Sequence, residues 1–176
     1  MAAAGARGVK IIPPAMGMYG DDDRLRPVFE AAFELKLPVL SQSGDGFGAP
    51  PAPGVDHYGR PRYHRRWLEE FPGLTLILAH LGHGYADDLA DMAHRYPNLY
   101  TDTSFQFGGL EESAEERRRM AELIRRIGTE KVLFGTNFPM TDPSLYARIL
   151  ERLPLTGAEK NLVGSDNARR ALNLGA

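Results

Sequence analysis

His80, Asp102 and Asn137 each follow an apolar run of this 176-residue sequence, at positions where their side chains could do chemistry. An imidazole takes up and releases protons near neutral pH, and a carboxylate acts as a base or binds a metal ion. An amide cannot carry a proton in this way. His80 and Asp102 are therefore candidate catalytic residues, and the role of Asn137 in the same kind of position needs an explanation.

Each of these residues also has a purely structural interpretation. His80 could be a capping or core histidine, and Asp102 could cap the loop that follows it. Gln42 and Asn137 could satisfy backbone groups at strand ends, as polar side chains often do. His83 sits in a glycine-rich turn, where a helix-start or solvent-facing position is the simpler interpretation. Residue type alone does not separate these alternatives, so the elements that position the residues matter.

Five apolar runs alternate with amphipathic patterns that predict helices. The runs are residues 9–12, 38–40, 74–78, 99–101 and 132–134. A helix follows each run, and the first is predicted near residues 24–36 from apolar positions that recur with helical spacing. Continuously apolar strands that alternate with helices predict an α/β domain with a parallel sheet.

This alternation leaves two architectures open. One is an open doubly wound sheet of the flavodoxin type, and the other is an arc of about five of the eight units of a (β/α)8 barrel. Both place functional residues at the carboxyl ends of the strands. The loop after the second strand, residues 43–59, is long and rich in glycine and proline, which indicates a functional or mobile segment.

Composition narrows the range of functions. Hydrophobic residues make up 43% and charged residues 25%, which is typical of one globular domain over residues 1–176. The net charge of −2 offers no basic surface to nucleic acid. The absence of cysteine excludes thiolate chemistry and favours a cytoplasmic location. No apolar stretch reaches the roughly 20 residues that a membrane helix needs. The other histidines, His57, His64 and His94, are expected in loops or on the outer surface.

Six stretches, in this order, resemble the amidohydrolase-related TIM-barrel family that includes aminocarboxymuconate-semialdehyde decarboxylase. They read GVKIIPP, PVLSQSG, FPGLTLILAHLG, YPNLYTDTS, RIGTEKVLFGTNFP and NARRALNL. The resemblance covers nearly all of the chain but only units four to eight of the family's barrel. It implies a partial (β/α)8 barrel that lacks the three N-terminal units, and it moves the flavodoxin-type sheet to second place. The alanine-rich residues 2–8 look like the last turn of a preceding helix.

In enzymes of this family, a divalent metal is held by an H-x-H pair on the first strand, a histidine ending the fifth and an aspartate ending the eighth. The aspartate is also the general base. His80 matches a further histidine of the site, which ends the sixth strand in the AHLG motif. Gln42 stands in place of the fifth-strand histidine and Asn137 in place of the aspartate, while the H-x-H pair has no counterpart. The resemblance therefore implies a degenerate metal site.

Amide oxygens are poor zinc ligands beside imidazole or carboxylate, so we expect no cofactor for this chain alone. If a separate segment supplied the H-x-H pair, His80 could join it in binding zinc or another divalent metal. Asp102 or Asp45 would then be the carboxylate available as a base. Lys10 could bind an anionic substrate, or it could point outward or form a salt bridge. The predicted substrate-binding residues are Lys10, Gln42, Asp45 and His83.

Three hypotheses about function fit this pattern. The first is an amidohydrolase-related hydrolase or decarboxylase that acts on a small carboxylated or cyclic substrate. The second is a non-catalytic relative that binds a ligand or serves as a scaffold, or a truncated fragment of a longer enzyme. The third is a metal-independent, lactonase-like enzyme that uses His80 and water.

The outermost strands of a partial sheet, residues 9–12 and 132–134, would have unpaired apolar edges. Such edges pair readily with other chains. We therefore expect a homo-oligomer, or a partner chain that covers the edges. The other expected partner is a small-molecule substrate or ligand, and no nucleic-acid or membrane partner is expected.

Overall fold

The computed structural model describes residues 5–174 and contains one sheet of five parallel strands. The strands are β1 (Val9–Ile11), β2 (Val39–Ser41), β3 (Leu76–Leu78), β4 (Leu99–Asp102) and β5 (Val132–Leu133). The helices are α1 (Arg26–Glu34), α2 (Arg65–Glu70), α3 (Ala86–Arg95), α4 (Ala114–Ile127), α5 (Pro143–Arg152), α6 (Gly157–Asn161) and α7 (Asn167–Ala171). The helical turn predicted at the N-terminus falls largely on residues 1–4, outside the described residues.

The strands lie in the order in which they occur along the chain, β1-β2-β3-β4-β5. A doubly wound sheet of the flavodoxin type has the order 2-1-3-4-5, because the second strand lies on one side of the first and the later strands are added on its other side. Sequential order with a helix after each strand is instead the arrangement of consecutive units in a (β/α)8 barrel. The fold is therefore a partial α/β TIM barrel, and the flavodoxin-type alternative is wrong.

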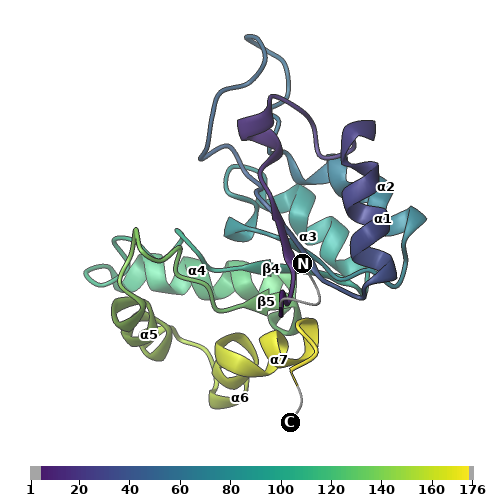
Figure 1. Cartoon of the computed structure of the whole chain (residues 1–176). Helices are drawn as coiled ribbons and strands as arrows, with labels where there is room; N and C mark the ends of the chain where they lie inside the picture. Colours follow the sequence, from purple (N-terminus) through teal and green to yellow (C-terminus); the bar gives the residue numbers. More distant parts are fainter. Residues whose placement is uncertain (1–4, 175–176) are drawn as a thin grey trace.

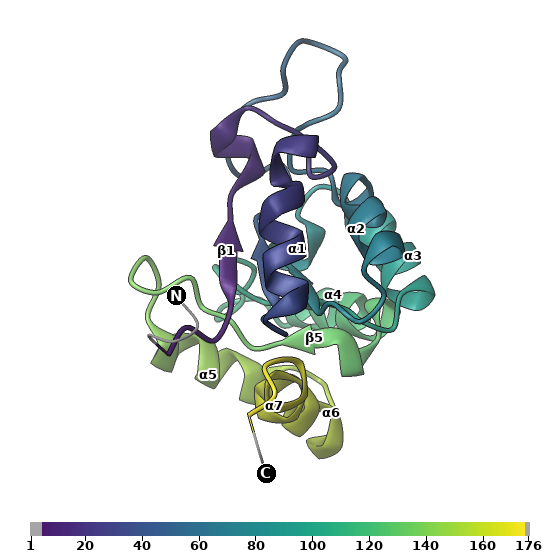
Figure 2. The ribbon, with the colours of Figure 1, turned by 45° about the vertical axis from the view of Figure 1, so that its right-hand side comes forward.

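The main hydrophobic core lies between the sheet and the helices that cover its outer face. Side chains of alternate strand positions enter this core, among them Val39, Leu76 and Leu99, which are fully buried. Figures 1 and 2 show α1, α2 and α3 packed together along one side of the strands. Trp67 of α2 stacks on Phe29 of α1 with 4.6 Å between the ring centroids, which joins the first two helices of this layer.

The opposite, inner face of the sheet has a smaller apolar cluster. Lys10, Leu40, Ile77 and Tyr100 are neighbours in the strand register and share this face. Ile77 and Leu133 pack there against residues of α7, including Ala171. Figures 1 and 2 place α7 directly beside β5, at the end of the molecule away from the long loop after β2. The C-terminal helix thus covers part of the face that a closed barrel would enclose.

Several helix ends have capping contacts that their residue types favour. Asp22 accepts a hydrogen bond from the backbone of Arg24 at the turn before α1. Gly128 ends α4, as its position after the helical pattern predicts. Thr156 and Glu159 form a capping box at the start of α6. These local signals define the helices that hold the strands in place.

Asn167 is expected to contribute strongly to the stability of this fold. Its fully buried amide donates to the carbonyl oxygens of Thr129 and Val132, at 2.7 and 2.8 Å, and so ties α7 to β5. Asn167→Ala leaves these buried acceptors without their donor and should lower the free energy of unfolding by about 2 kcal/mol. Urea denaturation measures this. Asn161→Ala, at an exposed position of α6, is the matched control and should change the stability little.

β1 and β5 are the end strands of the sheet, and each pairs with one other strand among residues 5–174. Coverage of their free edges by a second copy or a partner chain stays a prediction. No helix formed by the described residues is both long and apolar enough to span a bilayer.

Candidate functional site

The carboxyl ends of the five strands meet at one pocket of about 280 Å³. Five of the predicted site residues line it, namely Lys10, Gln42, His80, His83 and Asn137. The predicted gathering of these side chains at this end of the sheet is therefore present in the structure.

His80 is held by a hydrogen-bond network that defines its ring orientation. Its Nδ1 atom lies 2.9 Å from the backbone oxygen of Ser104. A carbonyl oxygen can only accept, so Nδ1 carries a proton and donates it. The backbone N–H of His80 in turn donates to Asp102 Oδ1 at 3.1 Å. Nε2 is therefore the ring atom left for a side chain or ligand in the pocket.

Asp102 lies beneath the pocket and does not line it. Its carboxylate accepts the backbone N–H groups of His80 and Ser104 and also the Ser104 hydroxyl. Only 9% of the residue is exposed. These contacts match the loop-capping interpretation, with the added effect that Asp102 positions the turn that bears His80. A ligand in the pocket is out of direct contact with this carboxylate.

Gln42 is the partner of the remaining His80 nitrogen, with its Oε1 atom 3.0 Å from Nε2. Either end of an amide group can meet this nitrogen, because oxygen and NH₂ have nearly the same shape. The NH₂ end satisfies a neutral ring, and the oxygen satisfies a ring that carries both protons. Gln42 can therefore hydrogen-bond to His80 whether or not Nε2 carries a proton, whereas an ionised carboxylate could only accept.

Three residues that line the pocket have left-handed backbone conformations, namely His80 (φ 68°), Phe105 (φ 66°) and Asn137 (φ 61°). Each costs about 1–2 kcal/mol for an ordinary residue, and less for asparagine. Such strain is typical of functional sites, where surrounding contacts hold it in place. Asn137 is thus both a turn residue and a lining residue, which answers the question that its position raises: the two interpretations are compatible.

His83 and Asp45 form a pair across two loops. His83 Nδ1 lies 2.8 Å from Asp45 Oδ1, and the backbone N–H of Asp45 donates to the carbonyl oxygen of His83 at 3.0 Å. His83 lines the pocket, and Asp45 stands behind it. The sequence pointed to both residues but not to their pairing, because 38 positions separate them along the chain.

The aromatic and methionine rim of the pocket was missed in the sequence. Phe47, Phe105 and Met140 line it while remaining 47%, 51% and 73% exposed. All three lie in loops that directly follow strand ends, and exposed apolar side chains in such loops are the signal that could have identified them. The rim offers apolar contact to a ring-shaped ligand.

The expectation that the other histidines lie in loops or on the outer surface holds for His57, which lies in a loop although it is buried, and for His94, which is exposed. It is wrong for His64, which lies in a buried helical turn. His57 is 4% exposed and His64 is fully buried. His64 Nε2 lies 2.8 Å from Ser41 Oγ, and a Cβ atom on Gly20 would overlap its ring. Burial lowers the pKa of His64 to about 4, because a charged ring would lose its hydration there.

The side chains around the pocket do not fit a metal site. Among residues 5–174, no three His, Asp or Glu side chains are grouped so that they could hold a metal ion. The donors that face the pocket are two imidazoles and neutral amides, and the Nδ1 atom of His83 is engaged by Asp45. The amide oxygens of Gln42 and Asn137 are weak ligands for zinc.

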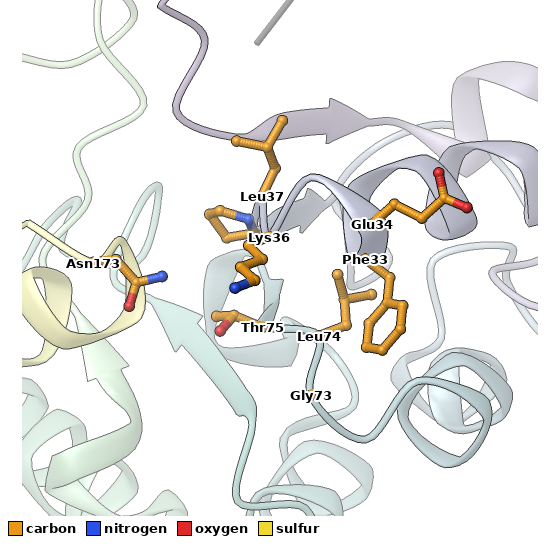
Figure 3. Close-up of a pocket in the computed structure, with 9 residues that line it drawn as sticks. Phe33, Glu34, Lys36, Leu37, Gly73, Leu74, Thr75 and Asn173 are labelled. Carbon is orange, nitrogen blue, oxygen red and sulfur yellow. The ribbon is translucent and has the colours of Figure 1, made fainter.

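A larger pocket of about 500 Å³ lies at the opposite end of the sheet. It is formed by the segments that precede β2 and β3, and Figure 3 shows Asn173 lying across from Lys36 and Thr75. It contains no histidine and none of the residues at the carboxyl ends of the strands. Because parallel α/β folds place their chemistry at those carboxyl ends, the smaller pocket is the candidate functional site.

An arc of parallel strands with a polar pocket at the carboxyl ends defines a TIM-barrel protein, and comparisons with known proteins identify its family. The sequence pattern of the amidohydrolase family matches residues 1–174. The chain therefore belongs to the amidohydrolase family. Comparison with curated proteins gives no match.

Solved structures of similar fold have longer chains. A TIM-barrel protein of uncharacterized function from Bordetella bronchiseptica is 26% identical, with a TM-score of 0.79 over 98% of this chain and 59% of its own. A proposed 2-pyrone-4,6-dicarboxylic acid hydrolase from Pseudomonas putida is 20% identical, with a TM-score of 0.69 over 100% of this chain and 66% of its own.

A third structure with this fold, a dihydroxybenzoic acid decarboxylase from Polaromonas sp. JS666, contains bound manganese. It is 19% identical, with a TM-score of 0.61 over 89% of this chain and 55% of its own. The present chain thus spans a little over half to two thirds of the length of these three proteins.

Proposed function

We propose that this chain carries the substrate pocket of a hydrolase or decarboxylase that acts on a small, carboxylated, cyclic compound. One observation carries the proposal: Lys10, His80 and the amides of Gln42 and Asn137 gather at the carboxyl ends of the strands, inside an apolar rim. Similar proteins named as a hydrolase and as a decarboxylase support the same class of reaction.

Lys10 supplies the positive charge that a carboxylated ligand needs. It lies on the inner face of β1 and forms no ion pair with any carboxylate of residues 5–174. Gln42 and Asn137 present amide groups, which can donate to carboxylate or carbonyl oxygens and accept from hydroxyl groups. A cationic residue combined with neutral donors recognises the anionic edge of a ring, while the aromatic rim contacts its faces.

Lys10→Gln is expected to weaken the binding of 2,6-dihydroxybenzoate by about 10-fold or more, because a charge-assisted hydrogen bond contributes about 1.5–3 kcal/mol. Binding of resorcinol, which has the same ring without the carboxylate, should change little. Isothermal titration calorimetry on the two probes measures both effects.

Lys36→Gln is the matched control, since Lys36 lines the pocket at the other end of the sheet. Equal losses for both probes, or an effect of Lys36→Gln as large as that of Lys10→Gln, would show that Lys10 does not bind the carboxylate. Failure of the unmodified protein to bind either compound would count against this class of ligand.

A binding protein without catalytic activity is the second candidate, and the amide at position 137 favours it. Asn137 cannot replace a general base, and no described carboxylate lines the pocket. Product formation separates the candidates: an enzyme converts a bound ring ester or ring carboxylate, whereas a binding protein releases it unchanged. Chromatography of the probes after incubation gives the answer.

A further inference from the structure

The ring of His83 is oriented by a carboxylate, in contrast to that of His80. An ionised carboxylate only accepts hydrogen bonds, so the 2.8 Å contact with Asp45 places a proton on His83 Nδ1. Nε2 is then the proton-free nitrogen of the neutral ring. A histidine whose Nδ1 is held by a carboxylate, with Nε2 available, has the arrangement of a general base.

Two loops are built to hold this pair. Gly44 donates its N–H to the carbonyl oxygen of Gly59 at 2.7 Å, which closes the loop that carries Asp45. Gly84 has a φ of +76°, and a Cβ atom at this position would overlap the Asp45 carboxylate. Only glycine at position 84 lets the carboxylate lie over the turn that follows His83. The contact between Asp45 and His83 therefore depends on glycine at position 84, where the left-handed backbone conformation also favours glycine.

His83 is better placed than His80 to exchange a proton with a ligand. Both nitrogens of His80 are engaged, Nδ1 by the Ser104 carbonyl and Nε2 by Gln42. The side chain of His83 is 49% exposed, and only its Nδ1 atom has a partner among the described residues. The proton-free nitrogen of His83 is thus open to water and ligand at the wall of the pocket.

We propose that His83 is the general base of this site and that Asp45 is its positioning residue, an inference that rests on the hydrolase form of the proposed function. His83 Nε2 takes a proton from water while the water oxygen bonds to the carbonyl carbon of a cyclic ester. The ring C–O bond then breaks, and the imidazolium returns the proton to the departing oxygen. Water and the ester are consumed, a hydroxy acid is formed, and His83 ends in its starting state.

Hydrolysis of dihydrocoumarin, a cyclic aromatic ester, tests the assignment on the full chain. His83→Asn should lower kcat by about 100-fold or more, since general base catalysis typically contributes 10²–10⁴-fold, with little change in KM. Asp45→Ala should also lower kcat, and Asp45→Glu should recover part of the loss. His94→Asn, at an exposed position away from the pocket, is the matched control and should leave kcat unchanged.

Imidazole ¹⁵N NMR gives a readout that does not depend on activity. The unmodified protein should show His83 as the Nδ1–H tautomer, with a downfield Nδ1 proton that is lost in Asp45→Ala and in Gly84→Ala. An Nε2–H tautomer, or a kcat that His83→Asn leaves unchanged, overturns the proposal. Absence of dihydrocoumarin turnover in the unmodified protein overturns the hydrolase function and with it the catalytic role, whereas the tautomer reports separately on the pair.

Discussion

The double substitution Gln42→His with Asn137→Asp is expected to create a zinc site where residues 5–174 have none. Gln42 Oε1 is 3.0 Å from His80 Nε2, so an imidazole at position 42 comes within reach of a metal bound to that nitrogen. The Ser104 carbonyl already holds His80 Nδ1, and replacing Gln42 removes the partner of Nε2, which is then available to bind metal. Aspartate, like asparagine, tolerates the left-handed conformation of position 137.

Two imidazoles and one carboxylate, with water in the fourth position, form a known zinc environment. We expect the double variant to gain about 4 kcal/mol in zinc binding, a fraction of the roughly 10–16 kcal/mol of complete structural sites. Each single variant should gain much less, because two ligands hold zinc poorly. A titration with chelator-buffered zinc measures all three affinities.

His80→Asn in the double-variant background is the control, and it should abolish most of the gain. Two results would contradict this picture. Tight stoichiometric zinc in the unmodified protein would reveal a ligand set that residues 5–174 do not show. No gain in the double variant would mean that positions 42 and 137 do not face a common point, and that Asn137 acts only as a turn residue.

Acid is expected to destabilise the fold through His64. Burial lowers the pKa of this histidine from 6.5 to about 4 in the folded protein. Between these two values the unfolded chain binds a proton that the folded chain does not, so stability falls as the pH decreases from 6.5 towards 4. A shift of this size corresponds to about 3 kcal/mol of unfolding free energy, all of it present above pH 6.5.

Urea denaturation at a series of pH values between 4 and 7 measures this loss. His64→Asn removes the titrating group, and although it lowers stability at pH 7, its pH dependence should be shallower by about 3 kcal/mol over this range. His94→Asn, which removes an exposed histidine, should keep the full dependence. Equal pH dependence in the unmodified protein and in His64→Asn would show that His64 is not the responsible group.

Periodicity and capping signals predicted the elements of this fold well. All five strands lie within one or two residues of the predicted apolar runs, and the capping box of Thr156 and Glu159 is present. These signals depend on neighbours within about one helical turn, so they can be recognised from the sequence alone. Strand order is not specified by such local signals, because the same alternation of strands and helices fits both a doubly wound sheet and a barrel arc.

The candidate site could be predicted only in part, because strand positions are readable from the sequence and loop conformations are not. Gln42, His80 and Asn137 follow strands and Lys10 lies on one, and parallel strands bring their carboxyl ends to one edge, so their gathering could be foreseen. Asp102 follows a strand as well, yet its carboxylate is used by the backbone of His80 and Ser104. Which polar group at a strand end faces the pocket depends on loop conformation, which the strand pattern does not specify.

The sequence by itself determined that the fold is α/β with a parallel sheet and predicted the end of that sheet at which the candidate site lies. Those properties follow from local periodicity and from residue identity. Only the tertiary structure decided that His64 is buried, that Asp102 positions a turn and that Asp45 orients His83. Burial and side-chain pairing depend on segments that are distant along the chain and meet only after packing, so no local pattern encodes them.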